Sequence, residues 1–159
     1  MGTLRSAARA AACILVPVVS GAAVGFLTMG GIQTWYVTLN KPWFTPPGYV
    51  FGPVWTVLYI LMGISLFLVI SHGWDEKPVK TGVLLFGFQL VANLVWSVLF
   101  FKLQSPIAGL ADIFLLLALI VLTIAAFYRV SKPAAMLLVP YLAWVCIATA
   151  LNVGVVLLN

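Results

Sequence analysis

Charge is scarce in this sequence. Eight basic and three acidic residues make up only 7% of the 159 positions, against roughly 25% in an ordinary soluble domain. Hydrophobic residues fill 64% of the chain. So few charged side chains cannot cover a protein in water, which excludes a soluble domain and makes a lipid bilayer the expected solvent. The net charge of +5 then indicates membrane orientation rather than nucleic-acid binding.

Residues that carry conventional chemistry are scarce as well. The chain has one histidine and two cysteines. Cys13 and Cys146 show no metal-ligand or redox spacing, and His72 is expected at a helix end, far from the other polar groups. The sequence contains no nucleophile–base pair, metal cluster or phosphate-binding loop. We therefore expect no metal site, no required cofactor and no conventional catalytic residue.

Long apolar runs dominate what is present, and each is long enough to span a bilayer as a helix of about 20 residues. The runs lie near residues 8–29, 45–71, 79–101, 106–128 and 133–158. The loops between them are short, apart from residues 30–44. The sequence therefore predicts an all-α membrane protein, a five-transmembrane-helix bundle that forms a single domain over residues 1–159.

Capping signals and prolines add local detail to these helices. Ser105-Pro106 and Thr45-Pro46 each read as an N-cap followed by proline at the first helical position. Pro140 removes a backbone hydrogen bond inside the fifth run, which predicts a kink there.

Basic residues are divided unequally between the two sides of the predicted bundle. The side of the N-terminus carries six of them and the opposite side two: Arg5, Arg9, Lys77, Lys80, Arg129 and Lys132 against Lys41 and Lys102. By the positive-inside rule, this bias predicts a cytoplasmic N-terminus and an outer C-terminus.

Polar and aromatic residues recur on single helical faces at one depth. Gln89, Asn93, Trp96 and Phe100 share a face of the third helix, Trp55 and Tyr59 lie on the second, and Tyr141, Trp144, Ala148 and Asn152 lie on the fifth. With about 1.5 Å of rise per residue, Asn93 lies about 12 Å below the outer helix end. Amide and indole groups facing lipid would leave hydrogen bonds unmade, so we expect these faces to point inward. They predict an aromatic pocket, open toward the outer side, for a large and flat ligand.

Asp112 is the acidic residue inside a predicted span. A carboxyl group is costly in lipid, so it marks a candidate site residue at about the depth of Asn93. A structural role, with hydrogen bonds to neighbouring helices, explains it equally well.

The segment KPWFTPPGYVFGPVW, residues 41–55, contains four prolines and five aromatic residues. The prolines stiffen a loop whose backbone needs few hydrogen-bond partners. We expect this loop to cover the pocket, with Trp43 and Tyr49 as interfacial anchors and Trp55 inside the pocket. Gly21 and Gly25 on the first helix fit either a dimer contact or close packing within the bundle.

Four blocks of the sequence resemble the TspO/MBR family, tryptophan-rich sensory proteins related to the mitochondrial translocator protein. The blocks are WYVTLNKPWFTPPGYVFGPVWTVLYILMG, QLVANLVWSVLFF, LADIFLLL and PYLAWVCIATALN. They cover nearly the whole chain from Trp35 onward. The resemblance implies a five-helix bundle, often a homodimer, that binds porphyrins and, in animal members, cholesterol and benzodiazepine-type ligands.

The resemblance also implies where the ligand binds. The matching positions are Tyr36, Pro47, Trp55, Gln89, Asn93, Trp96, Phe100, Trp144 and Ala148, to which the helical faces and depths add Tyr59 and Asp112. Two departures concern cholesterol. The end of the last helix, ALNVGVVLLN, lacks the Tyr and Arg of the animal cholesterol pattern, and Ala108 stands where those members have tryptophan. We therefore do not expect cholesterol as the natural ligand.

Three functions remain open at this point. The preferred one is a receptor or transporter that binds protoporphyrin IX or haem. The second is light-dependent porphyrin degradation, because Trp55 and Trp144 match tryptophans tied to that activity in some bacterial relatives. The third is a scaffold that acts through protein partners.

Overall fold

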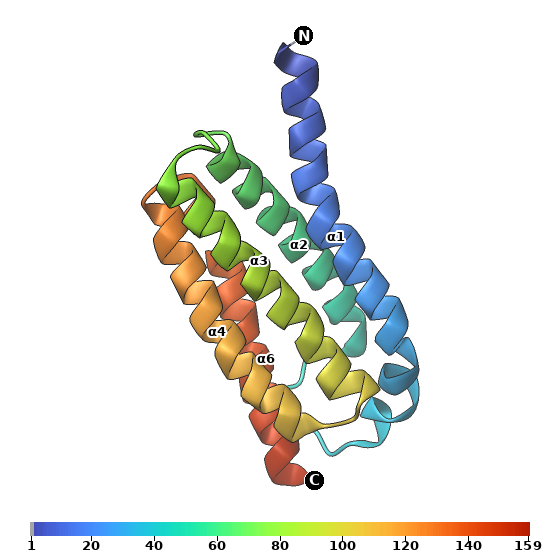
Figure 1. The fold of residues 1–159 in the computed structure, drawn as a ribbon. Coiled ribbons are helices and arrows are strands. Elements are labelled where there is room, and N and C mark those ends of the chain that lie inside the picture. The colour runs from blue at the N-terminus through green and yellow to red at the C-terminus, as the bar shows by residue number, and fades with distance from the viewer. Residues whose placement is uncertain (1) are drawn as a thin grey trace.

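A bundle of membrane-length helices forms the fold (Figure 1). The computed structural model describes residues 2–159. Its elements are α1 (Gly2–Thr34), a 3₁₀ turn η1 (Tyr36–Thr38), α2 (Gly48–Ile70), α3 (Lys77–Ser97), a π-helical turn η2 (Val98–Lys102), α4 (Pro106–Tyr128), α5 (Lys132–Leu137) and α6 (Val139–Leu158). Within the described residues, five segments are long and apolar enough to cross a membrane. The five-span prediction is therefore confirmed.

The two termini lie at opposite ends of the bundle, as an odd number of spans requires (Figure 1). α1 stands at one edge, beside α2, and its first turns project beyond the other helices. Loop 35–47 and the α3–α4 connection lie at the end that holds the C-terminus, which we call the C-terminal end. The loop after α2 and the α4–α5 connection lie at the opposite, N-terminal end.

Most predicted boundaries agree with the helices to within a few residues. The fourth predicted span, 106–128, coincides with α4. The first span is longer than predicted, because its apolar segment runs from Leu4 to Thr38. The fifth span consists of two helices that meet just before Pro140, where the proline was predicted to interrupt the helix.

The two predicted N-caps have different outcomes. The Ser105 side chain accepts a hydrogen bond from the Ala108 amide at 3.4 Å, so this cap is confirmed. The Thr45 cap is wrong, because α2 begins at Gly48 with Pro47 at its N-cap position. The Thr45 hydroxyl instead donates to the Pro42 carbonyl at 2.6 Å, within a turn of the loop. The tandem prolines account for the later start, since a residue that precedes proline is disfavoured in the helical conformation.

Two glycines allow the backbones of α1 and its neighbours to approach closely. A Cβ atom on Gly63 of α2 would collide with the backbone of Ile14, and one on Gly31 would collide with the carbonyl of Phe101. Lipid tails are as apolar as leucine, so helices in a bilayer associate largely through such close packing. α1 is therefore held at two places, against α2 in its first half and against η2 near its end.

The π-helical turn η2 alters the register at the end of α3. The Leu103 amide donates to the Val98 carbonyl at 2.9 Å, five residues back along the chain. Phe100 is buried against Trp35, Tyr36 and Trp96, while its neighbour Phe101 also reaches Tyr36 and Trp96. Two consecutive aromatic side chains thus both face the interior of the bundle. Single π-turns of this kind are frequent at functional sites.

Candidate ligand-binding site

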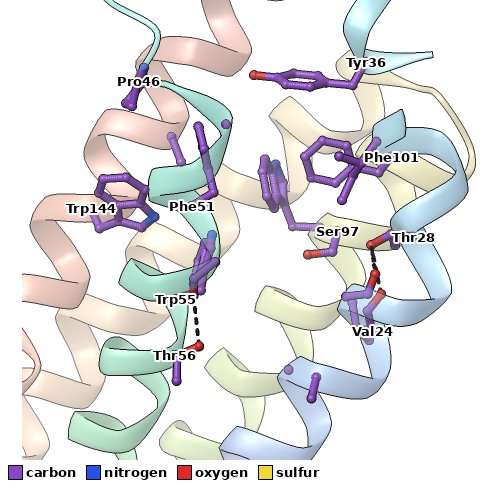
Figure 2. A pocket seen from close by; sticks show the side chains of 18 of the residues that line it. Val24, Thr28, Tyr36, Pro46, Phe51, Trp55, Thr56, Ser97, Phe101 and Trp144 are labelled. Carbon is purple, nitrogen blue, oxygen red and sulfur yellow. Dashed lines mark hydrogen bonds between the residues drawn. The ribbon is translucent and has the colours of Figure 1, made fainter. Parts of the chain in front are cut away.

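A cavity of about 590 Å³ lies in the half of the bundle nearest the C-terminal end. Residues from α1, loop 35–47, α2, the end of α3 and α6 line it (Figure 2). Its size falls within the usual range for small-molecule sites, which is roughly 300–1,000 Å³. The walls are mainly apolar and aromatic, as expected of a pocket for a hydrophobic ligand.

One wall of the cavity is aromatic and belongs to α2 and α6. Trp55 stacks on Tyr59 with ring centroids 5.6 Å apart and an interplanar angle of 28°. Phe51 packs edge to face against Trp144 at 5.7 Å. These rings present flat apolar surfaces, on which a planar ligand can stack in an offset or edge-on arrangement.

The opposite wall carries hydroxyl groups. Figure 2 shows the side chains of Tyr36 and Ser97 directed toward the aromatic wall from the other side of the cavity. Thr28 of α1 lies on the same side, but its hydroxyl donates to the Val24 carbonyl at 2.9 Å. The cavity therefore has one stacking wall and one wall with a few hydrogen-bonding groups.

A buried hydrogen-bond network lies behind the aromatic wall. The Tyr59 hydroxyl donates to Asn93 Oδ1 at 2.6 Å, and Asn93 Nδ2 donates to the Tyr141 hydroxyl at 3.1 Å. Tyr141 in turn donates to Gln89 Oε1 at 2.8 Å. Gln89 and Asn93 are each only 1% exposed. In the described residues, Gln89 Nε2 has no hydrogen-bond partner.

A second buried contact joins the end of α3 to α6 and α4. The Trp96 indole donates to Asn152 Oδ1 at 3.1 Å, and Asn152 Nδ2 donates to the Pro106 carbonyl at 2.8 Å. Asn152 thereby satisfies a proline carbonyl at the start of α4 as well as an indole. This contact fixes Trp96, whose ring lines the cavity and stacks on Phe100 at 5.4 Å.

The loop of residues 35–47 closes the C-terminal end of the cavity and is fastened to the end of α6. Asn40 and Asn159 exchange two hydrogen bonds between side chain and backbone, at 3.0 and 2.9 Å. Pro42 packs directly on Gly154. The loop contributes Lys41, Thr45 and Pro46 to the cavity. We call residues 35–47 the lid.

The structure places the predicted site residues in two groups. Six line the cavity: Tyr36, Trp55, Tyr59, Trp96, Trp144 and Ala148. Five are absent from its lining: Pro47, Gln89, Asn93, Phe100 and Asp112. Pro46 and Gly48 line the cavity on either side of the exposed Pro47. Gln89, Asn93 and Phe100 are buried one layer further in, where they support cavity residues.

Asp112 lies on α4, which contributes no residue to the cavity lining. Its side chain is half-buried, and among the described residues its Oδ2 atom is buried without a hydrogen-bond partner. It therefore belongs to the packing between helices rather than to the cavity wall.

The interfacial expectation for Trp43 and Tyr49 agrees with their position. Trp43 is 95% exposed and Tyr49 is 81% exposed. Both rings point away from the protein and are available to the headgroup region of a bilayer.

The predicted site residues include none from the α1 wall and omit several other lining residues. The missed α1 residues are Val18, Gly21, Ala22, Val24, Gly25, Thr28 and Ile32, and the others include Phe51, Ser97 and Phe101. The available signal was the row of small residues at Gly21, Gly25 and Thr28. In the structure Gly21 packs on the Tyr59 ring, whereas nothing lies within 4 Å of a Cβ atom built on Gly25.

Five apolar membrane-length segments, four of which line an aromatic cavity, define the chain as an integral multi-pass membrane protein of the all-α class. Its family follows from sequence comparison. The TspO/MBR family matches residues 13–158, nearly the whole chain. The chain belongs to the TspO/MBR family.

Named relatives agree with this assignment. The chain is 50% identical over 149 residues to the tryptophan-rich protein TspO of Chlorobaculum tepidum, a match that covers 94% of each chain. It is 47% identical to the protein of the same name in Archaeoglobus fulgidus, over 93% of this chain and 95% of that one. It is also similar to the human translocator protein, with 42% identity over 74% of this chain and 70% of the human one.

Proposed function

We propose that the protein binds a porphyrin, protoporphyrin IX or haem, in the cavity beneath the lid. The observation that carries the proposal is the cavity itself, about 590 Å³ in volume, with the rings of Phe51, Trp55 and Trp144 along one wall. A flat and mostly apolar macrocycle complements such a wall through stacking and apolar burial. Binding of this kind is the first step in sensing, transporting or degrading the ligand.

The same proposal includes an orientation. Six of the eight basic residues lie toward the N-terminal end of the bundle and two toward the C-terminal end. The positive-inside rule then places the N-terminus in the cytoplasm and the lid on the outer side. The ligand accordingly occupies the outer half of the membrane.

A cavity-filling substitution tests the binding proposal. Gly25 lines the cavity and has nothing within 4 Å of its Cβ position, so we expect the side chain of Gly25→Phe to extend into the cavity and occupy ligand volume. We expect this variant to bind protoporphyrin IX at least about tenfold more weakly, in a dark titration followed by tryptophan quenching and the porphyrin absorption band. Gly30→Phe is the matched control, because Gly30 also has open space but does not line the cavity. Equal affinities of the two variants would contradict binding in this cavity.

The stack of Trp55 on Tyr59 favours light-driven porphyrin degradation as a second candidate function. Both rings line the cavity, so a bound macrocycle lies next to an oxidisable indole. Trp55→Phe preserves a stacking surface but removes the indole. We expect it to retain most of the affinity in darkness and to slow the loss of the porphyrin band under illumination. Bleaching as fast as in wild type would exclude this role for Trp55.

A further inference from the structure

Lys41 is the charged side chain among the described residues that line the cavity. The three acidic residues of the chain lie elsewhere: Asp75 and Glu76 are at the N-terminal end of the bundle, and Asp112 is on α4. The cavity therefore combines apolar walls with one cationic group at its rim, and none of its lining residues supplies a negative charge.

The surroundings of the Lys41 ammonium group are neutral. Its Nζ donates to the carbonyl oxygens of Tyr36 at 2.9 Å and Leu39 at 3.1 Å, and it has a long contact with that of Val37 at 3.5 Å. It also lies 4.9 Å from the centroid of the Tyr36 ring. Carbonyl dipoles and a ring face orient the ammonium group without cancelling its charge. The side chain belongs to the lid and is half-buried, so an opposite charge interacts with it more strongly than it would in open water.

We propose that the cavity selects ligands that carry an acid group, and that Lys41 is the residue that recognises the carboxylate. The apolar body of the ligand stacks on the wall of Phe51, Trp55 and Trp144, while its carboxylate lies at the rim beside the ammonium group. The Tyr36 side chain, which projects into the cavity from the same turn, supplies a hydroxyl donor near that position. The proposal rests on ligand binding in the cavity and adds the chemical group that the site requires.

A purely structural role for Lys41 makes a different prediction. Its bonds to the carbonyls of η1 hold the lid in shape, so their loss would disturb the binding of every ligand alike. Charge recognition, in contrast, affects only ligands that carry the acid. A ligand pair that differs in this group alone separates the two roles.

Protoporphyrin IX and its dimethyl ester form such a pair, since esterification removes both carboxylates and keeps the macrocycle. We would measure the affinity of each for wild type and for Lys41→Met in nanodiscs of neutral lipid, in darkness. For each ligand separately, we divide the affinity of the variant by the affinity of wild type. This ratio cancels the difference between the two ligands in their partitioning into lipid. We expect Lys41→Met to weaken the free acid about tenfold, as for a lost charge-assisted hydrogen bond, and to change the diester less than about twofold.

Two further variants complete the experiment. Lys102→Met removes the other lysine at the same end of the bundle, which lies outside the cavity, and should leave both affinities unchanged. Lys41→Arg retains the charge and should restore most of the selectivity for the acid.

The outcomes separate the two proposals. If Lys41→Met loses the same affinity for the acid and the diester, or loses affinity for neither, acid recognition by Lys41 is overturned and porphyrin binding stands. Wild-type protein that binds neither ligand refutes porphyrin binding itself. If Lys41→Met does not fold, the wild-type preference for the acid is measured against salt concentration; a preference that does not weaken as salt rises also overturns the proposal.

Discussion

At the scale of single residues, the buried amides of α3 were predicted to contact the ligand, but in the structure they lie outside the cavity and bond to tyrosines. Asn93 and the Oε1 atom of Gln89 are bonded to tyrosine hydroxyls instead of facing the ligand. A buried polar group without a partner costs roughly 1–3 kcal/mol, so each member of the network stabilises the others. Tyr59 belongs both to this network and to the cavity wall.

We therefore predict that Asn93→Leu acts on binding through Tyr59. The substitution removes the acceptor of the Tyr59 hydroxyl and one of the two partners of the Tyr141 hydroxyl, and the freed Tyr59 ring is then less well placed in the cavity wall. We expect about a fivefold loss of porphyrin affinity, which corresponds to about 1 kcal/mol, together with a lower unfolding temperature in detergent. Leu94→Ala is the control, because Leu94 neither lines the cavity nor takes part in the hydrogen-bond network of Asn93. If this control variant loses as much affinity as Asn93→Leu, the proposed link through Tyr59 is wrong.

At the scale of elements, the position of the lid depends on contacts with α6 at the far end of the sequence. The paired amides of Asn40 and Asn159 and the packing of Pro42 on Gly154 join segments more than 100 residues apart. The hydrogen bonds require the amide side chain of Asn159. The packing requires a glycine at position 154, because a Cβ atom there would collide with the Pro42 ring.

Gly154→Val should displace the lid without disturbing the helices. The new side chain would occupy the space of the Pro42 ring, so we expect the lid to detach and bound porphyrin to dissociate several-fold faster. Stopped-flow release of protoporphyrin IX into excess apomyoglobin measures this rate, and circular dichroism monitors the helical content. Gly87→Val is the matched control, since nothing lies within 4 Å of its Cβ position. Release at the same rate from both variants would show that the lid does not retain the ligand.

At the scale of the whole molecule, the fold is asymmetric across the membrane. The cavity and lid lie at the C-terminal end of the bundle, while most basic residues lie toward the N-terminal end. By the positive-inside rule, the unequal charge predicts which way the bundle inserts, and the direction of insertion decides from which side the lid is reached.

Cysteine labelling in intact cells tests this orientation. Thr38 in the lid and Glu76 before α3 are exposed and lie at opposite ends of the bundle. In a background with Cys13→Ala and Cys146→Ala, we expect an impermeant maleimide to label a cysteine at Thr38 from outside. A cysteine at Glu76 should react only after the membrane is permeabilised. The reverse pattern would show the opposite orientation, and labelling of both from outside would show that α2 does not cross the membrane, which would contradict the five-span arrangement.

The sequence by itself determined the helices and their inward faces. Composition and the length of the apolar runs predicted five spans, and helical periodicity grouped Trp55 with Tyr59 and Gln89 with Asn93, because residues three or four positions apart share a face. The tertiary structure alone decided what each face meets. Gln89 and Asn93 face inward as predicted, yet two tyrosines from other helices cover them and hold them out of the cavity.

α1 and η2 show why the remaining part of the site could not be predicted. α1 is mainly apolar within its span, and in lipid an apolar side chain is equally stable against the bilayer or against a cavity, so only the row of small residues at Gly21, Gly25 and Thr28 marks the face that lines the site. The π-helical turn shifts the register after Ser97, which brings Phe101 to the cavity beside a buried Phe100. Regular helical periodicity cannot predict this shift, since it arises where α3 ends against α1 and α4.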